Sequence, residues 1–136
     1  MNKEVANLEN VKVVLVSINS SYENLINHTP VKGKERLIDC VQKFWPVTAA
    51  RANKADYVFG IYKNEIKAVA KIVKPWKRVF DYMQKGYFTE DEEPMRDRSL
   101  ISRCAFIGEL VEDSPYLGKK LSATDKLSGP SRYINC

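Results

Sequence analysis

The sequence is poor in the residues that most often carry out catalysis or bind metals. It has one histidine, His28, and three cysteines, Cys40, Cys104 and Cys136, and it contains no HExxH, P-loop or CxxC motif. Structural zinc sites draw their ligands from closely spaced residues, whereas these four are scattered over the whole chain. We therefore expect no metal, no cofactor and no enzymatic activity, and we interpret the cysteines as reduced thiols.

The single histidine gives little support to catalysis. His28 stands beside Thr29 and Pro30 in a polar segment, without a carboxylate or cysteine nearby in the sequence. This setting is more typical of a solvated loop histidine than of a general base. A thiol nucleophile made from Cys40 and His28 is formally open, but no further residue supports it.

Long apolar runs are also missing. The longest one, Val13–Val16 with Ile18 beyond a serine, is far too short to span a bilayer. The first residues lack the apolar core of a signal peptide. We expect a single cytoplasmic domain of 136 residues that contacts no membrane, with residues 1–10 frayed or in a short helix.

Charge is present in excess and is unevenly spread. Residues 31–86 hold thirteen Lys and Arg against five Asp and Glu, a balance of +8, and residues 87–113 hold three against eight, a balance of −5. A basic block beside an acidic one can form a polyanion-binding face with an acidic flap, but the lysines can equally serve to solvate strands. The run Glu90–Glu93 lies in residues 85–102, whose composition predicts a long mobile loop.

Four segments carry strand patterns. The clearest is a hairpin within residues 55–74, in which Asn64 is the residue best suited to the left-handed backbone of a tight turn. Runs of β-branched and apolar residues predict further strands at residues 11–19, 103–111 and 132–135.

The remaining segments predict short helices and loops. Residues 49–55 are rich in alanine and follow Thr48, a suitable N-cap, and residues 79–83 allow one or two helical turns. Residues 19–34 have the composition of a loop, and residues 35–44 fit a helix or a strand equally well.

The first strand ends in a cluster of short polar side chains, Ser17, Asn19, Ser20 and Ser21. Such residues commonly form the turn at a strand end. Alternatively, polar groups at the end of a buried strand can line the mouth of a pocket. Both interpretations are open from the sequence.

Together these elements predict an α+β fold, with a small, partly open β-barrel and short helices. Several motifs resemble those of the PUA-like superfamily, near its EVE and ASCH branches, in small bacterial and phage proteins. The motifs run from residue 40 to the end: Trp45-(5)-Arg51-Ala52-(2)-Ala55-Asp56-Tyr57-Val58, the hairpin, Arg103-(2)-Phe106-(1)-Gly108-Glu109, Tyr116-Leu117-Gly118-Lys119 and Arg132-Tyr133-Ile134-Asn135.

The resemblance implies a pseudo-barrel whose cleft binds RNA, or a modified base flipped out of DNA. In such a cleft the base stacks on aromatic side chains, and its edge is hydrogen-bonded by polar groups at strand ends. The aromatic candidates are Trp45, Tyr57, Phe59 and Tyr133, and the polar candidates are Ser17, Asn19 and Asp56.

The chemistry of individual residues suggests further candidates for binding a nucleic acid, and each of them also has a purely structural interpretation. Trp76 lies among Lys74, Lys77 and Arg78, as a base-stacking residue in a phosphate-binding surface would, although tryptophan in a small domain is more often core.

Two arginines complete the predicted site. Arg51 and Arg103 could contact phosphate or stack on a base, or could instead form ion pairs with Asp56 or Glu109.

We therefore predict a module that binds DNA, RNA or a modified nucleobase. Two alternatives remain at this point. One is a phage or mobile-element inhibitor that masks a host defence or nucleic-acid enzyme through Glu90–Glu93. The other is a sponge for a small nucleotide that uses the same cleft.

Overall fold

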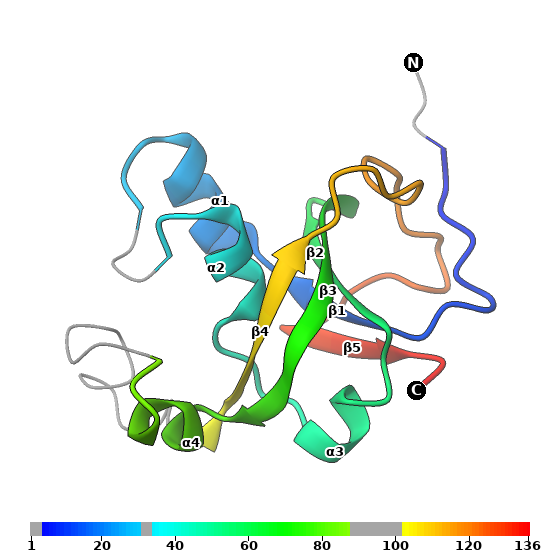
Figure 1. Ribbon diagram of the computed structural model, residues 1–136. Coiled ribbons are helices and arrows are strands. Elements are labelled where there is room, and N and C mark those ends of the chain that lie inside the picture. Colours follow the sequence, from blue (N-terminus) through cyan, green and yellow to red (C-terminus); the bar gives the residue numbers. More distant parts are fainter. Residues whose placement is uncertain (1–3, 31–33, 88–101) are drawn as a thin grey trace.

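The computed structural model describes residues 4–30, 34–87 and 102–136, and it has an α+β fold built on one mixed sheet (Figure 1). The five strands lie in the order β4-β3-β2-β1-β5, and β1 and β2 are parallel whereas the other neighbours are antiparallel. The elements in chain order are β1 (Val13–Ser17), α1 (Asn19–Ile26), α2 (Leu37–Gln42), α3 (Ala49–Ala52), β2 (Tyr57–Tyr62), β3 (Glu65–Arg78), α4 (Val79–Gln84), β4 (Cys104–Leu110) and β5 (Ser131–Ile134).

The predicted hairpin is confirmed as β2 and β3. Lys63 and Asn64 join the strands with φ angles of 48° and 65°, and positive φ at both central residues is the requirement of a type I′ turn. β2 lies in the middle of the sheet, between β1 and β3. This position explains why both faces of β2 carry apolar side chains.

Both faces of the sheet carry a core, because different segments cover each one. The first face packs against α2 and α3, and its buried residues include Val14, Val58, Ala70, Cys40, Trp45, Trp76 and Phe106. The second face packs against the N-terminal segment and the chain between β4 and β5, and its buried residues include Leu15, Phe59, Ile66, Ala6, Leu8 and Leu121. A smaller cluster joins α4 to β4 through Val79, Tyr82, Ala105 and Phe44.

The N-terminal segment differs from its prediction. Ala6 and Leu8 are each only 2 % exposed, and the Ala6 N–H donates to the Lys120 carbonyl at 2.8 Å. The prediction of a frayed end or a short helix is therefore wrong for these residues. They are ordered by a segment more than a hundred residues away, which no local pattern can reveal.

The predicted loop at residues 19–34 is wrong for its first half, where the chain forms α1. Serine and asparagine have modest helix propensity, so tertiary contacts rather than composition stabilise this helix. The Tyr22 ring lies 4.6 Å from the Tyr62 ring, and the Tyr62 hydroxyl donates to Glu23 Oε1 at 3.0 Å.

The other helices follow the predictions more closely. The ambiguous residues 35–44 contain a helix, α2, over Leu37–Gln42, and residues 79–84 form α4. The alanine-rich helix α3 is shorter than predicted, and Thr48 occupies its N-cap position without a side-chain hydrogen bond.

The sheet is not closed in the part of the chain that the structure describes. β4 and β5 form its two edges and lie at opposite ends of the strand order, so the predicted barrel is not confirmed. One isolated bridge, between Trp45 and Cys104, extends the sheet beyond β4. No helix in the described ranges combines the length and the apolar character that crossing a bilayer demands.

Candidate functional site

A cavity of about 380 Å³ opens where β1 ends, and we name it the strand-end cavity. The residues that line it come from the end of β1, from α1 and from the chain on either side of the Trp45–Cys104 bridge. They are Ser17, Asn19, Ser20, Ser21, Asn24, Lys34, Phe44, Trp45 and Arg103. Four of the nine residues predicted from the sequence therefore meet here: Ser17, Asn19, Trp45 and Arg103.

Backbone hydrogen bonds fix the polar side of the cavity. The Ser17 N–H donates to the Pro130 carbonyl at 2.9 Å, and the Ile18 N–H donates to the Ile61 carbonyl at 3.0 Å. These bonds hold the chain as it leaves β1, so that α1 begins directly at Asn19. The first turns of α1 then supply the remaining hydroxyl and amide groups. Polar groups at a strand end thus line a pocket, which was the second of the two interpretations open from the sequence.

The opposite side of the cavity is built by the Trp45–Cys104 bridge. Each of these residues donates its N–H to the carbonyl of the other at 2.8 Å. The bridge brings Phe44 and Trp45 beside Arg103, whose Nη1 donates to the Phe44 carbonyl at 3.5 Å. On the same side, Lys34 Nζ lies 5.6 Å from the centre of the Phe44 ring.

Trp45 serves mainly as a wall of the cavity. Its side chain belongs to the core, the residue is only 7 % exposed, and its Nε1 donates to the Val41 carbonyl at 2.6 Å. A base could therefore meet only a small part of the ring. Trp45 is therefore a core residue that also lines the cavity.

The charge of the strand-end cavity is positive. Lys34 and Arg103 are its cations, and no carboxylate is found among the described residues that line it. With five hydroxyl or amide groups from Ser17 and α1 close by, the cavity offers hydrogen-bonding groups to a neutral ring and positive charge to an anion.

Cys40 lies close to this region, and its thiol is poorly suited to act as a nucleophile. Burial raises its pKa, against the opposing effects of the Ser21 hydroxyl and Lys34, so the reactive thiolate is disfavoured. His28 is exposed after the end of α1. Within the described ranges, no three His, Cys, Asp or Glu side chains are arranged to hold a metal ion.

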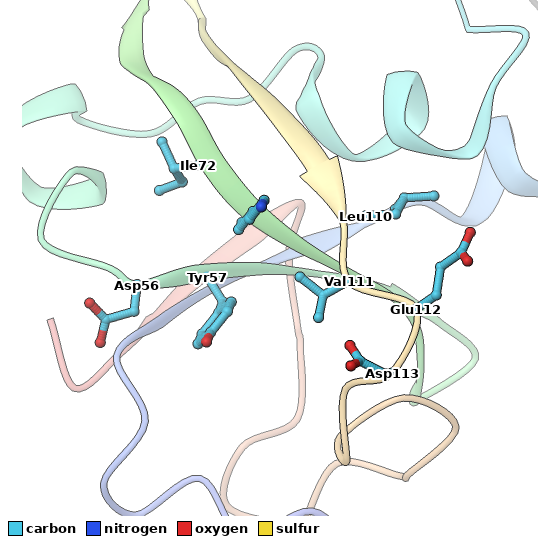
Figure 2. Close-up of a pocket in the computed structure, with 8 residues that line it drawn as sticks. Asp56, Tyr57, Ile72, Leu110, Val111, Glu112 and Asp113 are labelled. Atoms are coloured by element: carbon cyan, nitrogen blue, oxygen red, sulfur yellow. The ribbon is translucent and has the colours of Figure 1, made fainter.

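Asp56 and Tyr57 lie elsewhere, in a larger cavity of about 840 Å³ that we name the acidic cavity. In Figure 2 Asp56 lies directly before β2, and Tyr57, the first residue of β2, lies between Asp56 and the segment after β4, which contributes Val111, Glu112 and Asp113. This cavity shares no lining residue with the strand-end cavity. Its lining holds three carboxylates against one cation, Lys71, so the net negative charge would repel a phosphate.

The separation of the two cavities follows from the strand directions. β1 and β2 are parallel, and Val13 pairs with Tyr57 whereas Ser17 pairs with Ile61. The start of β2 therefore lies beside the start of β1, at the opposite end of the strands from Ser17. The sequence contains both polar clusters but does not reveal this parallel pairing.

Arg51 and Tyr133 bind each other and their neighbours rather than lining either cavity. The Arg51 guanidinium lies 4.1 Å from the centre of the Tyr133 ring, and Arg51 Nε donates to the Cys136 carbonyl at 3.0 Å. The alternative of an ion pair between Arg51 and Asp56 does not occur among the ion pairs of the described residues. Glu109, the other acid considered, pairs with Lys71 at 3.3 Å.

The two remaining aromatic candidates are core residues. Trp76 is 1 % exposed and packs on Phe106, with ring centres 4.7 Å apart. Phe59 is fully buried and packs on Tyr116. Neither ring offers a face to a ligand, so both are withdrawn as stacking candidates.

Sequence reasoning missed Asn24, Lys34 and Phe44 as cavity residues. Asn24 was hidden because its segment was predicted to be a loop, whereas the helical spacing of Ser20, Ser21 and Asn24 is what turns them to one side. Most of the predicted acidic loop, including Glu90–Glu93, lies outside the described residues.

In comparisons with known proteins, no protein-family model, no curated protein and no solved structure matches this chain. Function must therefore be argued from the residues alone.

Proposed function

We propose that this protein binds a nucleic acid, DNA or RNA, by accepting one nucleotide in the strand-end cavity. The observation that carries the proposal is the combination of two cations with a cluster of hydroxyl and amide groups against an aromatic wall. Among the described residues of the lining no acid opposes a phosphate. The PUA-like assignment belongs to the same proposal, supported by the motif spacing and by a mixed sheet with short helices.

The roles of the residues follow from their chemistry. Arg103 and Lys34 would bind phosphate oxygens, because cationic side chains donate charge-assisted hydrogen bonds to them. Ser17 and Asn19 would hydrogen-bond the edge of the base, since amides and hydroxyls both donate and accept. Trp45 would bound the base on its apolar side.

The size of the cavity favours one unpaired nucleotide. Pockets for small organic ligands span about 300–1,000 Å³, so a volume of about 380 Å³ lies at the small end of that range. A base must leave a duplex, or come from a single strand, to enter such a site. We therefore expect single-stranded or flipped nucleotides to bind in preference to intact duplex.

Titration with labelled single- and double-stranded DNA and RNA, with and without base modification, at two salt concentrations tests the proposal. Arg103→Gln and Asn19→Ala should each weaken binding by about tenfold, as expected for the loss of one good polar contact. Arg132→Gln is the matched control, because Arg132 is an exposed arginine that lines none of the cavities described above. Thermal melts of all three variants would check that the fold is intact.

The proposal fails if the wild-type protein shows no salt-dependent binding to any of these polymers, because a cationic site must release counterions. It also fails if binding occurs but Arg103→Gln and Asn19→Ala bind as the control does. Mass spectrometry of ligands that co-purify with the protein distinguishes a polymer from a free small nucleotide, for which the same cavity would serve.

A further inference from the structure

A second positively charged surface lies at the end of β3 and around α4. It consists of Lys74, Lys77 and Lys85 together with Tyr87, and we name it the basic cluster. Lys74 Nζ lies 5.6 Å from the centre of the Tyr87 ring, and that tyrosine is 42 % exposed. Figure 1 shows that α4 follows directly on β3 and lies beside the start of β4.

The fold brings these lysines together although they repel one another. Lys77 and Lys85 are close enough for their ammonium groups to interact, and this interaction lowers the pKa of Lys77. Lys74 adds to the same effect, and Asp81 is the carboxylate that opposes it. Such a concentration of positive charge attracts an anion with several charges.

The cluster uses a different aromatic residue from the one that the sequence suggested. Trp76 lies between Lys74 and Lys77 in the sequence, but its side chain is directed into the core against Phe106. The exposed ring beside the lysines belongs instead to Tyr87, which the turn after α4 brings back to Lys74. The Tyr87 N–H donates to the Tyr82 carbonyl at 3.1 Å and fixes this turn.

Arg103 connects the basic cluster to the strand-end cavity. Its side chain lines the cavity, whereas its carbonyl accepts the N–H of Val79, the first residue of α4, at 2.8 Å. In the same region Lys77 pairs with Ala105 and Arg78 with Cys104 across β3 and β4. The end of β3, which carries Lys77 and Arg78, therefore lies beside the segment that carries Arg103.

We propose that the basic cluster binds the phosphates that flank the nucleotide held in the strand-end cavity, so that the ligand is a nucleic-acid strand rather than a free nucleotide. This inference rests on the proposed function, because it takes the cavity to be a nucleotide site. It adds that affinity for a polymer depends on a surface that a mononucleotide does not reach. An exposed Tyr87 ring beside Lys74 also suits stacking by an adjacent unpaired base.

The test is the salt dependence of oligonucleotide binding by the triple variant Lys74→Gln, Lys77→Gln, Lys85→Gln. A triple variant at exposed lysines elsewhere, Lys12→Gln, Lys71→Gln, Lys120→Gln, is the control with the same change in net charge. Each phosphate contact on a single strand contributes about 0.7 to the slope of log affinity against log salt, so the slope should fall by about 2 in the first variant. Wild type should accordingly lose about 20-fold more affinity than that variant between about 50 and 200 mM salt.

Binding of a mononucleotide separates this inference from the proposed function. The triple variant should bind the mononucleotide as wild type does, whereas Arg103→Gln should weaken both mononucleotide and oligonucleotide. If the oligonucleotide slope of the triple variant equals that of wild type and of the control, the proposed role of the basic cluster is wrong. The proposed cavity site is unaffected by that result. A slope that falls as expected while Arg103→Gln has no effect overturns the cavity, and with it the claim that the bound phosphates flank a nucleotide held there. A wild-type protein that binds no oligonucleotide overturns both the cavity and the basic cluster.

Discussion

The Arg51 guanidinium lies over the Tyr133 ring, 4.1 Å from its centre, and joins α3 to β5. The same tyrosine accepts the Thr48 N–H through its hydroxyl oxygen at 2.7 Å, directly before α3. Two residues that the sequence suggested as base-binding therefore hold together segments 85 residues apart. Cation–π pairs of this kind contribute about 0.5–1 kcal/mol at exposed sites.

Tyr133→Phe is expected to lower the free energy of unfolding by about 1 kcal/mol, because the Thr48 N–H loses its acceptor while the stacked ring remains. Chemical denaturation measures this change. Tyr57→Phe, at an exposed tyrosine, is the control and should change stability by less than about 0.5 kcal/mol. Nucleic-acid binding should be unaffected by Tyr133→Phe, and a clear loss of binding would return Tyr133 to the site.

Trp45→Ala is expected to lower the free energy of unfolding by about 3–5 kcal/mol, because the indole is buried and donates a hydrogen bond to Val41. A loss of that size is a large part of the stability of a domain of this length. Trp45→Phe keeps an aromatic wall and should cost less, which leaves a folded protein for binding assays.

Denaturation and binding curves on both variants separate the two roles of Trp45. If Trp45→Phe binds nucleic acid as wild type does, the wall needs only an apolar ring. If the folded fraction of Trp45→Ala binds as wild type does, Trp45 is a core residue alone and leaves the site.

The strands could be predicted from the sequence because their signal is local. Alternating or continuous apolar residues mark β1, β2 and β4, and the turn at Asn64 requires only two residues with positive φ. The burial of Trp76 could not be predicted from the sequence, because lysines on both sides of a tryptophan are compatible with either a buried or an exposed ring. The side chain is buried because residue 76 of β3 faces the core on the first face of the sheet, which packs against α2 and α3.

The candidate site was predictable only in part, for a topological reason. Ser17, Asn19, Trp45 and Arg103 meet because the chain returns to the end of β1 through the Trp45–Cys104 bridge, a contact between residues 59 apart in sequence. Asp56 was grouped with them on its chemistry, yet parallel pairing of β1 and β2 puts it beside the start of β1, at the other end of the strands. Residue types identify the chemistry of a site, whereas strand order and direction decide which residues share it.

Gly108→Ala is expected to destabilise the fold by about 1–3 kcal/mol, as overpacking of a filled core does. A Cβ at this position would lie 2.5 Å from Phe106 Cε2 and 2.7 Å from the Lys71 carbonyl oxygen, which belongs to the neighbouring strand and cannot easily move. Gly129→Ala is the matched control, because a Cβ there has no heavy atom within 4 Å. Equal melting temperatures for the two variants would contradict the close packing of β3 and β4 at this point.

Tyr82 should make the fold sensitive to alkaline pH. Its side chain is buried and its hydroxyl donates to the Pro75 carbonyl, and burial, with a smaller effect of Tyr87, raises its pKa from 10 to about 12. In the unfolded chain the phenol ionises near its ordinary pKa, whereas in the folded protein it stays neutral up to the raised value. The stabilisation from the neutral phenol is therefore complete below about pH 10 and is lost as the pH rises toward 12.

Urea denaturation at a series of alkaline pH values tests this expectation. The free energy of unfolding of wild type should fall by on the order of 2 kcal/mol more than that of Tyr82→Phe between about pH 9 and pH 12. Comparing variants cancels the titration of the lysines and the other tyrosines, and Tyr57→Phe should keep the full pH dependence of wild type. Ultraviolet absorbance of the folded protein should show one tyrosine of the seven ionising after the exposed ones. Identical pH profiles for wild type and Tyr82→Phe would show that the Tyr82 hydroxyl is in contact with solvent. That result would contradict the buried packing of α4 on β4.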